Sequence, residues 1–280
     1  MKKLLITLLF AAGLLTACTT ATHTAKKREN TGKAILGISP GKKEIIVTAV
    51  TADDSPVQVE GCTVTELPSG EEIFLEALGD AVVLKGNITE LDCSSNELTA
   101  LDVRGLTALQ TLHCDNNRLT SLDVQGLIAL QLLDCSSNAI ASIDVRGLTG
   151  LRMLYCDNNR LTSLDVQGLT ALQLLVCSDN QLTALNVQGL PALQALVFQH
   201  NRLEEDALIR ILNSLPDRKT DEEAEAVFYT EDDNRNEENS TDWNASDGLQ
   251  AAIKRARAKN WTIYKQIVGG DFEELEVTEE

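Results

Sequence analysis

The chain has 280 residues, with 24 Lys and Arg against 42 Asp and Glu, and a formal net charge of −18 at pH 7. Hydrophobic residues make up 43% of it, which is enough apolar side chain for a core and excludes wholesale disorder. The acidic balance argues against nucleic acid as a partner, because phosphate backbones attract surfaces rich in Lys and Arg.

Residues 1–17 have the form of a bacterial signal peptide, with two lysines at the start and an apolar run over residues 4–15. The run ends in Leu-Thr-Ala-Cys, which resembles a lipobox, where the Cys receives a diacylglyceryl group and becomes the new N-terminus. We therefore expect lipidation of Cys18 and a flexible polar tether over residues 18–33. The alternative is an ordinary signal peptide with an incidental Cys. Lipidation predicts anchoring in the bacterial cell envelope, at the outer membrane, with the surface and the periplasmic side both open.

Residues 34–83 alternate apolar and polar side chains as strands do, notably in residues 44–50 and 57–59. Gly and Pro interrupt the pattern at residues 39–41 and 67–70. A repeat stack exposes its core at both ends and needs polar covers. We predict a small N-terminal β cap joined to the first repeat.

A 21-residue repeat occupies residues 84–203. Its units follow the pattern L-x-x-L-x-(L/C)-x-x-N-x-L, which is that of leucine-rich repeats, and five cysteines recur in register: Cys93, Cys114, Cys135, Cys156 and Cys177. The pattern predicts an α/β repeat solenoid, a leucine-rich repeat horseshoe with a parallel β-sheet on its concave face.

Each recurring position has a predicted role. Leu112 and Cys114 alternate along a short strand, so both point inward while His113 points outward. The repeated Asn, for example Asn117, can satisfy backbone groups that the turn leaves unpaired. The repeated Gly, for example Gly126, permits a tight bend or a positive φ.

The cysteine column could bind metal or form disulfides, but we interpret its members as small core residues. They lack the clustered C-x-x-C geometry of a metal site, and parallel inward side chains are stacked rather than turned toward each other. Cys62 lies outside the column and is predicted to be a buried free thiol.

The segment from Leu91 to Val103, Leu-Asp-Cys-Ser-Ser-Asn-Glu-Leu-Thr-Ala-Leu-Asp-Val, resembles the repeats of internalin-type proteins with a 21-residue cysteine ladder. It is more similar still to internalin-related lipoproteins of Bacteroidetes. The resemblance implies an adhesive or protein-binding surface. The sequence departs from the family in having no visible cell-wall sorting motif and no immunoglobulin-like module.

Residues 204–268 are predicted to form a C-terminal α/β cap, which resembles the cap of the Bacteroidetes proteins. We expect one helix over residues 207–215, ended by Pro216, and a second from Ser246 or Asp247 to Lys259. Residues 231–242 form an acidic loop, and residues 269–280 an acidic tail. Calcium binding in the loop is an alternative that the missing D-x-D-x-D-G spacing disfavours.

Equivalent outward-facing positions on successive strands form columns along the sheet. The residues in these columns change from polar at the N-terminal end to apolar at the C-terminal end. We predict a contiguous exposed apolar patch on the concave face, which marks an interaction site. The predicted partner-binding residues are Leu132, Met153, Tyr155, Leu174 and Val176, together with His113 and Asp134.

The row Asp92, His113 and Asp134 places an imidazole between two carboxylates on adjacent strands. It could hold a divalent metal or, with Ser94 or Ser136, imitate a hydrolase triad. We interpret it as a solvated ion-pair row, because an open sheet face lacks the enclosed site that such catalysis needs.

The sequence therefore predicts a lipid-anchored, non-enzymatic binding protein of the cell envelope, with adhesion as one role. Its partners are a protein or peptide ligand and, through Cys18, the membrane. No catalytic residue, metal or cofactor is expected. The alternative is a hydrolase or metal-dependent enzyme that uses the Asp92, His113 and Asp134 row, or an activity in the N-terminal cap.

Overall fold

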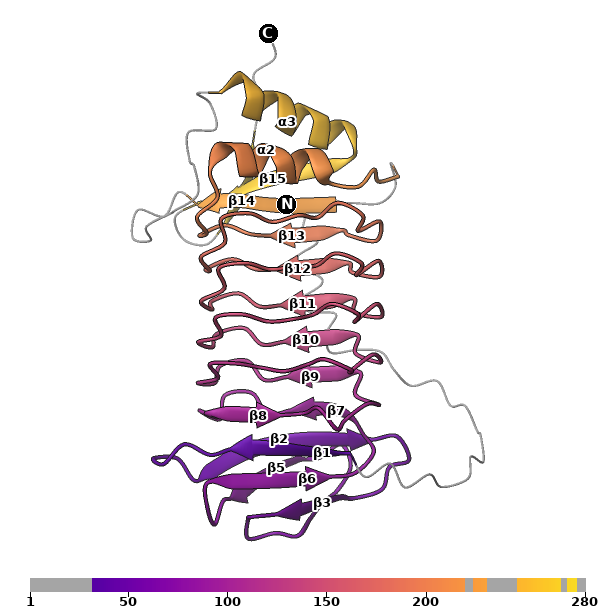
Figure 1. The fold of residues 1–280 in the computed structure, drawn as a ribbon, viewed down its shortest axis with the longest axis vertical. Coiled ribbons are helices and arrows are strands. Elements are labelled where there is room, and N and C mark those ends of the chain that lie inside the picture. The colour runs from indigo at the N-terminus through magenta and orange to yellow at the C-terminus, as the bar shows by residue number, and fades with distance from the viewer. Residues whose placement is uncertain (1–31, 220–223, 231–245, 268–270, 276–280) are drawn as a thin grey trace.

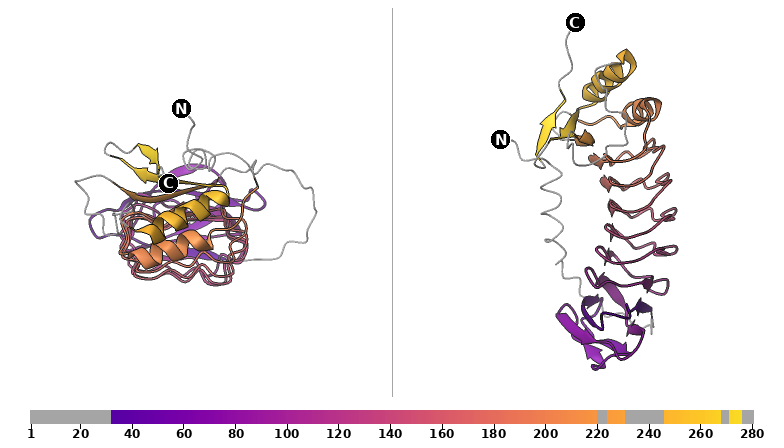
Figure 2. Two further views of the ribbon diagram at one scale, coloured as in Figure 1. Left: turned by 90° about the horizontal axis from the view of Figure 1, so that it is seen from above. Right: turned by 90° about the vertical axis from the view of Figure 1, so that its left-hand side faces the viewer.

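The structure, a computed structural model, describes residues 32–219, 224–230, 246–267 and 271–275. They form a long stack of coils with a cap at each end (Figure 1). The strands of the coils lie along one side of the stack, here called the concave face, and the return segments lie along the opposite side (Figure 2). No helix among these residues is long and apolar enough to cross a membrane. The predicted signal peptide, Cys18 and the acidic loop 231–242 lie outside the described residues.

The N-terminal cap is built from six strands. They are β1 (Lys33–Gly37), β2 (Glu44–Thr51), β3 (Val57–Glu60), β4 (Glu66–Leu67), β5 (Glu72–Glu76) and β6 (Ala81–Lys85). The cap is continuous with the repeats on both sides, because β2 pairs antiparallel with the first repeat strand, β7 (Ile88–Asp92), and β1 pairs antiparallel with β8 (Ala100–Asp102). The cap therefore covers the open edge of the first coil with hydrogen-bonded backbone.

The repeats contribute one short strand per coil to a parallel ladder. The strands after β8 are β9 (Thr111–His113), β10 (Leu132–Asp134), β11 (Met153–Tyr155), β12 (Leu174–Val176) and β13 (Ala195–Val197). The register is constant, with Leu133 opposite Leu112 on one side and Leu154 on the other. These middle leucines are fully buried, so the first and third residue of each strand lie on the concave face.

The cysteine column lies in the core as predicted, and its five thiols are buried and free. Each of the first four Sγ atoms lies 3.3–3.5 Å from a backbone oxygen of the next coil, as with Cys114 and the carbonyl of Asp134. Burial is the main cause that raises the pKa of these thiols. Cys62 is likewise buried and free.

The asparagine ladder closes the turn after each strand. Asn180 donates from Nδ2 to the carbonyls of Cys156, Cys177 and Ser178 at 2.9, 3.3 and 3.1 Å, and its Oδ1 accepts from the N–H of Leu161 at 2.9 Å. Each amide thus links two coils, which confirms the predicted role. Gly126 and its equivalents in the next three repeats have φ of 78–82°, whereas Gly105 has an ordinary φ and faces Lys33 of β1.

The C-terminal cap continues the sheet and covers it with two helices (Figure 1). Its elements are α2 (Glu205–Ser214), β14 (Ala224–Thr230), α3 (Asp247–Ala258), β15 (Trp261–Gln266) and β16 (Phe272–Glu274). Both predicted helices are present, and Ser246 caps α3 by accepting from the N–H of Leu249. Strand β16 lies within the predicted acidic tail and pairs antiparallel with β15 at the edge of the sheet.

Candidate functional site on the concave face

The apolar end of the concave face is buried, which corrects the predicted exposed patch. Leu132 is 8% exposed, Tyr155 6%, Leu174 0% and Val176 4%, and only Met153 of the five is half-buried. The prediction assumed that side chains pointing outward from the sheet are exposed to solvent. Here the side chains pack on one another across β11, β12 and β13, and the cluster extends into the C-terminal cap.

The cap side chains explain how this cluster is closed. Val227 of β14 belongs to the cluster, and Tyr264 of β15 and Phe272 of β16 pack against it. Strand β14 adds in parallel to β13, so the column of Val176 and Val197 continues into the cap at Val227, whereas the neighbouring column ends at Glu225. The C-terminal end of the concave face is therefore a second small core.

The accessible part of the face lies toward the N-terminal cap and is polar. Asp92 is exposed, while His113, Asp115, Asp134 and Asp157 are half-buried. These residues come from the ends of neighbouring strands, in register. Of the predicted partner-binding residues, His113, Asp134 and Met153 remain available to a ligand.

The acidic side chains lie close enough to influence one another. Burial, followed by repulsion from Asp134, Asp179 and Asp115, raises the pKa of Asp157 to about 6. The pKa of Asp134 is also raised, mainly by burial, although hydrogen bonds from Ser136 oppose the shift. The accessible face therefore concentrates negative charge in an environment with less water than the open surface.

Three of these acids, Asp115, Asp157 and Asp179, were absent from the predicted site. Asp115 and Asp157 follow the cysteine in alternate repeats, where Ser94, Ser136 and Ser178 occupy the others. Asp179 occupies the next position, which has a φ of 51–52° from the coil of Asn116 onward and carries Asn, Ser, Asp or His. The alternation of Ser and Asp after each Cys was the signal that could have identified Asp115 and Asp157, and it does not mark Asp179.

The predicted row is brought together only in part. One ring nitrogen of His113 and one carboxylate oxygen each from Asp115 and Asp134 lie within 4.8 Å of one another. Asp92 is not a member of this group. Its Oδ1 instead accepts from the N–H and the hydroxyl of Ser94 at 2.9 and 2.7 Å.

The serine hydroxyls do not take the place that a hydrolase triad requires. Ser136 Oγ donates to Asp134 Oδ1 at 2.7 Å, and Ser94 Oγ donates to Asp92 in the same way. A nucleophilic serine needs a base such as histidine as its hydrogen-bond partner. The contacts at these two serines therefore position carboxylates and do not activate a nucleophile.

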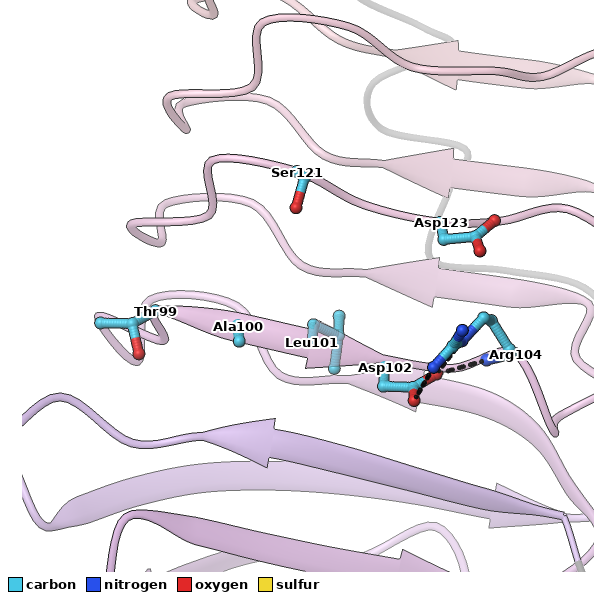
Figure 3. Close-up of a pocket in the computed structure, with 7 residues that line it drawn as sticks. All are labelled: Thr99, Ala100, Leu101, Asp102, Arg104, Ser121 and Asp123. Carbon is cyan, nitrogen blue, oxygen red and sulfur yellow. Dashed lines mark hydrogen bonds and ion pairs between the residues drawn. The ribbon is translucent and has the colours of Figure 1, made fainter.

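A shallow pocket of about 180 Å³ lies elsewhere, between β8 and the return segment of the next coil (Figure 3). Its cation, Arg104, is paired with Asp102, with Nε 3.0 Å from Oδ1 and Nη2 2.8 Å from Oδ2. The hydrogen bond from Arg104 is the main cause that lowers the pKa of Asp102. Because the two charges satisfy each other, this pocket has less to offer a charged ligand than the concave face.

Comparison with known proteins agrees with the repeat architecture. The family model described as Leucine Rich repeats (2 copies) matches residues 86–127 and again residues 128–169. No curated protein sequence matches the chain.

Three solved structures are similar to part of the chain. The functional domain of InlJ from Listeria monocytogenes, which includes a cysteine ladder, is 29% identical, with 50% of this chain and 39% of that chain covered and a TM-score of 0.31. An internalin from the same organism, InlF, is 17% identical, with 64% and 48% covered and a TM-score of 0.46. A leucine-rich repeat protein from Leptospira interrogans is 23% identical, with 57% and 38% covered and a TM-score of 0.43.

The chain thus spans less than half of the length of these three structures. The match to the repeat family rests on residues 86–169, and the constant register of β9 to β13 shows the same repeats in three dimensions. Residues 86–169 are therefore leucine-rich repeats, and a ladder of buried cysteines lies in the core of the repeat stack.

Proposed function

We propose that the chain is a binding protein whose acidic concave face engages a positively charged segment of a protein or peptide. Solenoid repeats present an extended surface of this kind to their ligands. The observation that carries the proposal is the acidic strip, which consists of Asp92, Asp115, Asp134, Asp157 and Asp179 on adjacent coils. Complementary charge favours a ligand rich in Lys or Arg, both in encounter rate and in choice of partner.

The proposal predicts selective binding of a lysine-rich peptide by the purified chain, measured by fluorescence anisotropy in buffer with EDTA. The double variant Asp115→Asn, Asp157→Asn should bind about tenfold more weakly, because two unit charges leave the strip. Added salt should weaken binding to the unchanged chain more than to the variant.

The matched control is the double variant Asp123→Asn, Asp165→Asn, which changes net charge equally at exposed positions on the return side. It should bind within about twofold of the unchanged chain. Equal effects of the two double variants, or equal affinity for a glutamate-rich peptide, would contradict the proposal.

The pH dependence of peptide binding provides a further test of the proposal. Because the pKa of Asp157 is raised to about 6, its side chain is mostly protonated at pH 5 and ionised at pH 8. Lysine side chains stay charged over this range. Affinity for the lysine-rich peptide should therefore rise from pH 5 to pH 8, and the rise should be smaller in the Asp115→Asn, Asp157→Asn variant.

We also propose that the chain is anchored through lipidated Cys18 in the bacterial cell envelope, at the outer membrane, where its face can support adhesion. The proposal rests on the signal-like residues 1–17 and on the lipobox-like sequence before Cys18. Expressed in a bacterium, the chain should partition into the detergent phase of Triton X-114, and Cys18→Ala should move it to the aqueous phase. Intact-mass measurement of the unchanged chain should show the added lipid, and a mass without it would reject the anchor.

A further inference from the structure

Three potential metal ligands meet on the accessible part of the concave face. His113 ends β9, Asp134 ends β10 directly beside it, and Asp115 follows two residues after His113. One ligand atom from each lies within 4.8 Å of the other two. The parallel register places Asp134 beside His113, and Asp115 joins them from two residues further along the coil of His113.

The spacing leaves His113 near two carboxylates without a direct bond to either. The His113 imidazole forms no hydrogen bond or ion pair with another side chain in the described part of the molecule, although two carboxylates lie near it. Ligand atoms bonded to one tetrahedral ion at about 2.0–2.2 Å lie about 3.3–3.6 Å apart, which is closer than the 4.8 Å limit within which these three atoms lie. Small side-chain rotations would therefore close the three atoms around an ion.

Hydrogen bonds from neighbouring groups fix one oxygen of each carboxylate. Asp134 Oδ1 accepts from Ser136 N and Oγ at 3.1 and 2.7 Å, and Asp115 Oδ2 accepts from Asn116 Nδ2 at 2.7 Å. The hydrogen bonds to Asp134 all go to Oδ1, and that to Asp115 goes to Oδ2. Such outer contacts orient carboxylates that serve as metal ligands.

We propose that His113, Asp115 and Asp134 bind one divalent transition metal ion of the Zn²⁺ type. An imidazole nitrogen with two carboxylate oxygens suits Zn²⁺, whereas Ca²⁺ and Mg²⁺ take oxygen ligands. Three protein ligands leave further coordination positions open toward solvent. Asp115 and Asp134 also belong to the acidic strip, but peptide binding is measured in EDTA without metal, so failure of one proposal leaves the other standing.

Isothermal titration calorimetry with ZnCl₂ and the purified chain, with its thiols kept reduced, tests the site. The unchanged chain should bind Zn²⁺, and His113→Ala, Asp115→Asn and Asp134→Asn should each weaken one site by more than the roughly 10-fold to 100-fold that loss of an outer hydrogen-bond partner costs. Titration with CaCl₂ should give no binding that these variants alter. A Zn²⁺-dependent shift of the His113 ring resonances in NMR should report the same site directly.

Asp92→Asn is the matched control, because Asp92 shares the column of His113 and Asp134 but lies outside the group. It should retain the site within about threefold. Circular dichroism checks that each variant is folded, and Asp115→Asn is the conservative change least able to disturb the core. Absence of Zn²⁺ binding, an unshifted His113 ring, or equal affinity in the three ligand variants and Asp92→Asn would overturn the proposal.

Discussion

Replacement of Asn180 by Ala is expected to lower the free energy of unfolding by about 3–5 kcal/mol. The amide of Asn180 makes three donor contacts and one acceptor contact to backbone groups of two coils. The side chain is 7% exposed, so water cannot easily replace these contacts. Each buried polar group left without a partner costs about 1–3 kcal/mol. Urea unfolding followed by circular dichroism measures the change.

Asn159→Ala is the matched comparison, because Asn159 makes the equivalent four contacts one coil earlier but is half-buried. Water can reach its backbone partners, so its loss should be smaller, about 1–2 kcal/mol. If both variants lost less than about 1 kcal/mol, the ladder would not be a main source of stability.

Leu174→Asp is expected to lower the free energy of unfolding by more than about 3 kcal/mol. Leu174 is 0% exposed in the cluster with Tyr155, Val176 and Val197. A carboxylate there would be buried without a cation, which is among the most damaging single changes. The measurement separates the buried cluster found here from the exposed patch that the sequence predicts, for which the same change would be nearly neutral.

Gln131→Asp serves as the control, because Gln131 is exposed immediately before β10 and the change adds the same charge. Its effect should stay within about 0.5 kcal/mol. A Leu174→Asp variant as stable as the control would restore the exposed patch and reject the buried cluster. Leu174→Ala should lose about 2–5 kcal/mol, which tests packing without the charge.

The sequence was enough to predict the repeat architecture because each coil repeats the same physical solution. Leu112 and Cys114 must point inward whenever their strand is paired on both sides, and Asn117 must close the turn that follows. Because the same pattern recurs in register five times with a period of 21 residues, a chance match to the repeat is excluded. The capping helices followed for a similar reason, since Ser246 and the apolar spacing of α3 are local signals.

The site could be predicted only in part, because outward direction is a local property whereas exposure is not. The columns through Leu132, Tyr155 and Val176 were placed correctly on the concave face, but the cluster that buries Tyr155 and Val176 includes side chains of distant segments. Tyr264 and Phe272 reach them only after α2, β14 and α3 have folded back onto the stack. The periodicity of the repeats does not indicate that side chains of the C-terminal cap pack against this cluster.

By itself, the sequence determined the coil, its period, its inward residues and the polarity gradient along the outer columns, because these follow from alternation and backbone hydrogen bonding within one repeat. The tertiary structure decided which outward residues meet water and which acids meet His113. Asp115 lies beside His113 and Asp134, and Asp92 does not, although Asp92 shares their column and Asp115 lies two residues further along its coil. Proximity between coils is a property of the assembled stack.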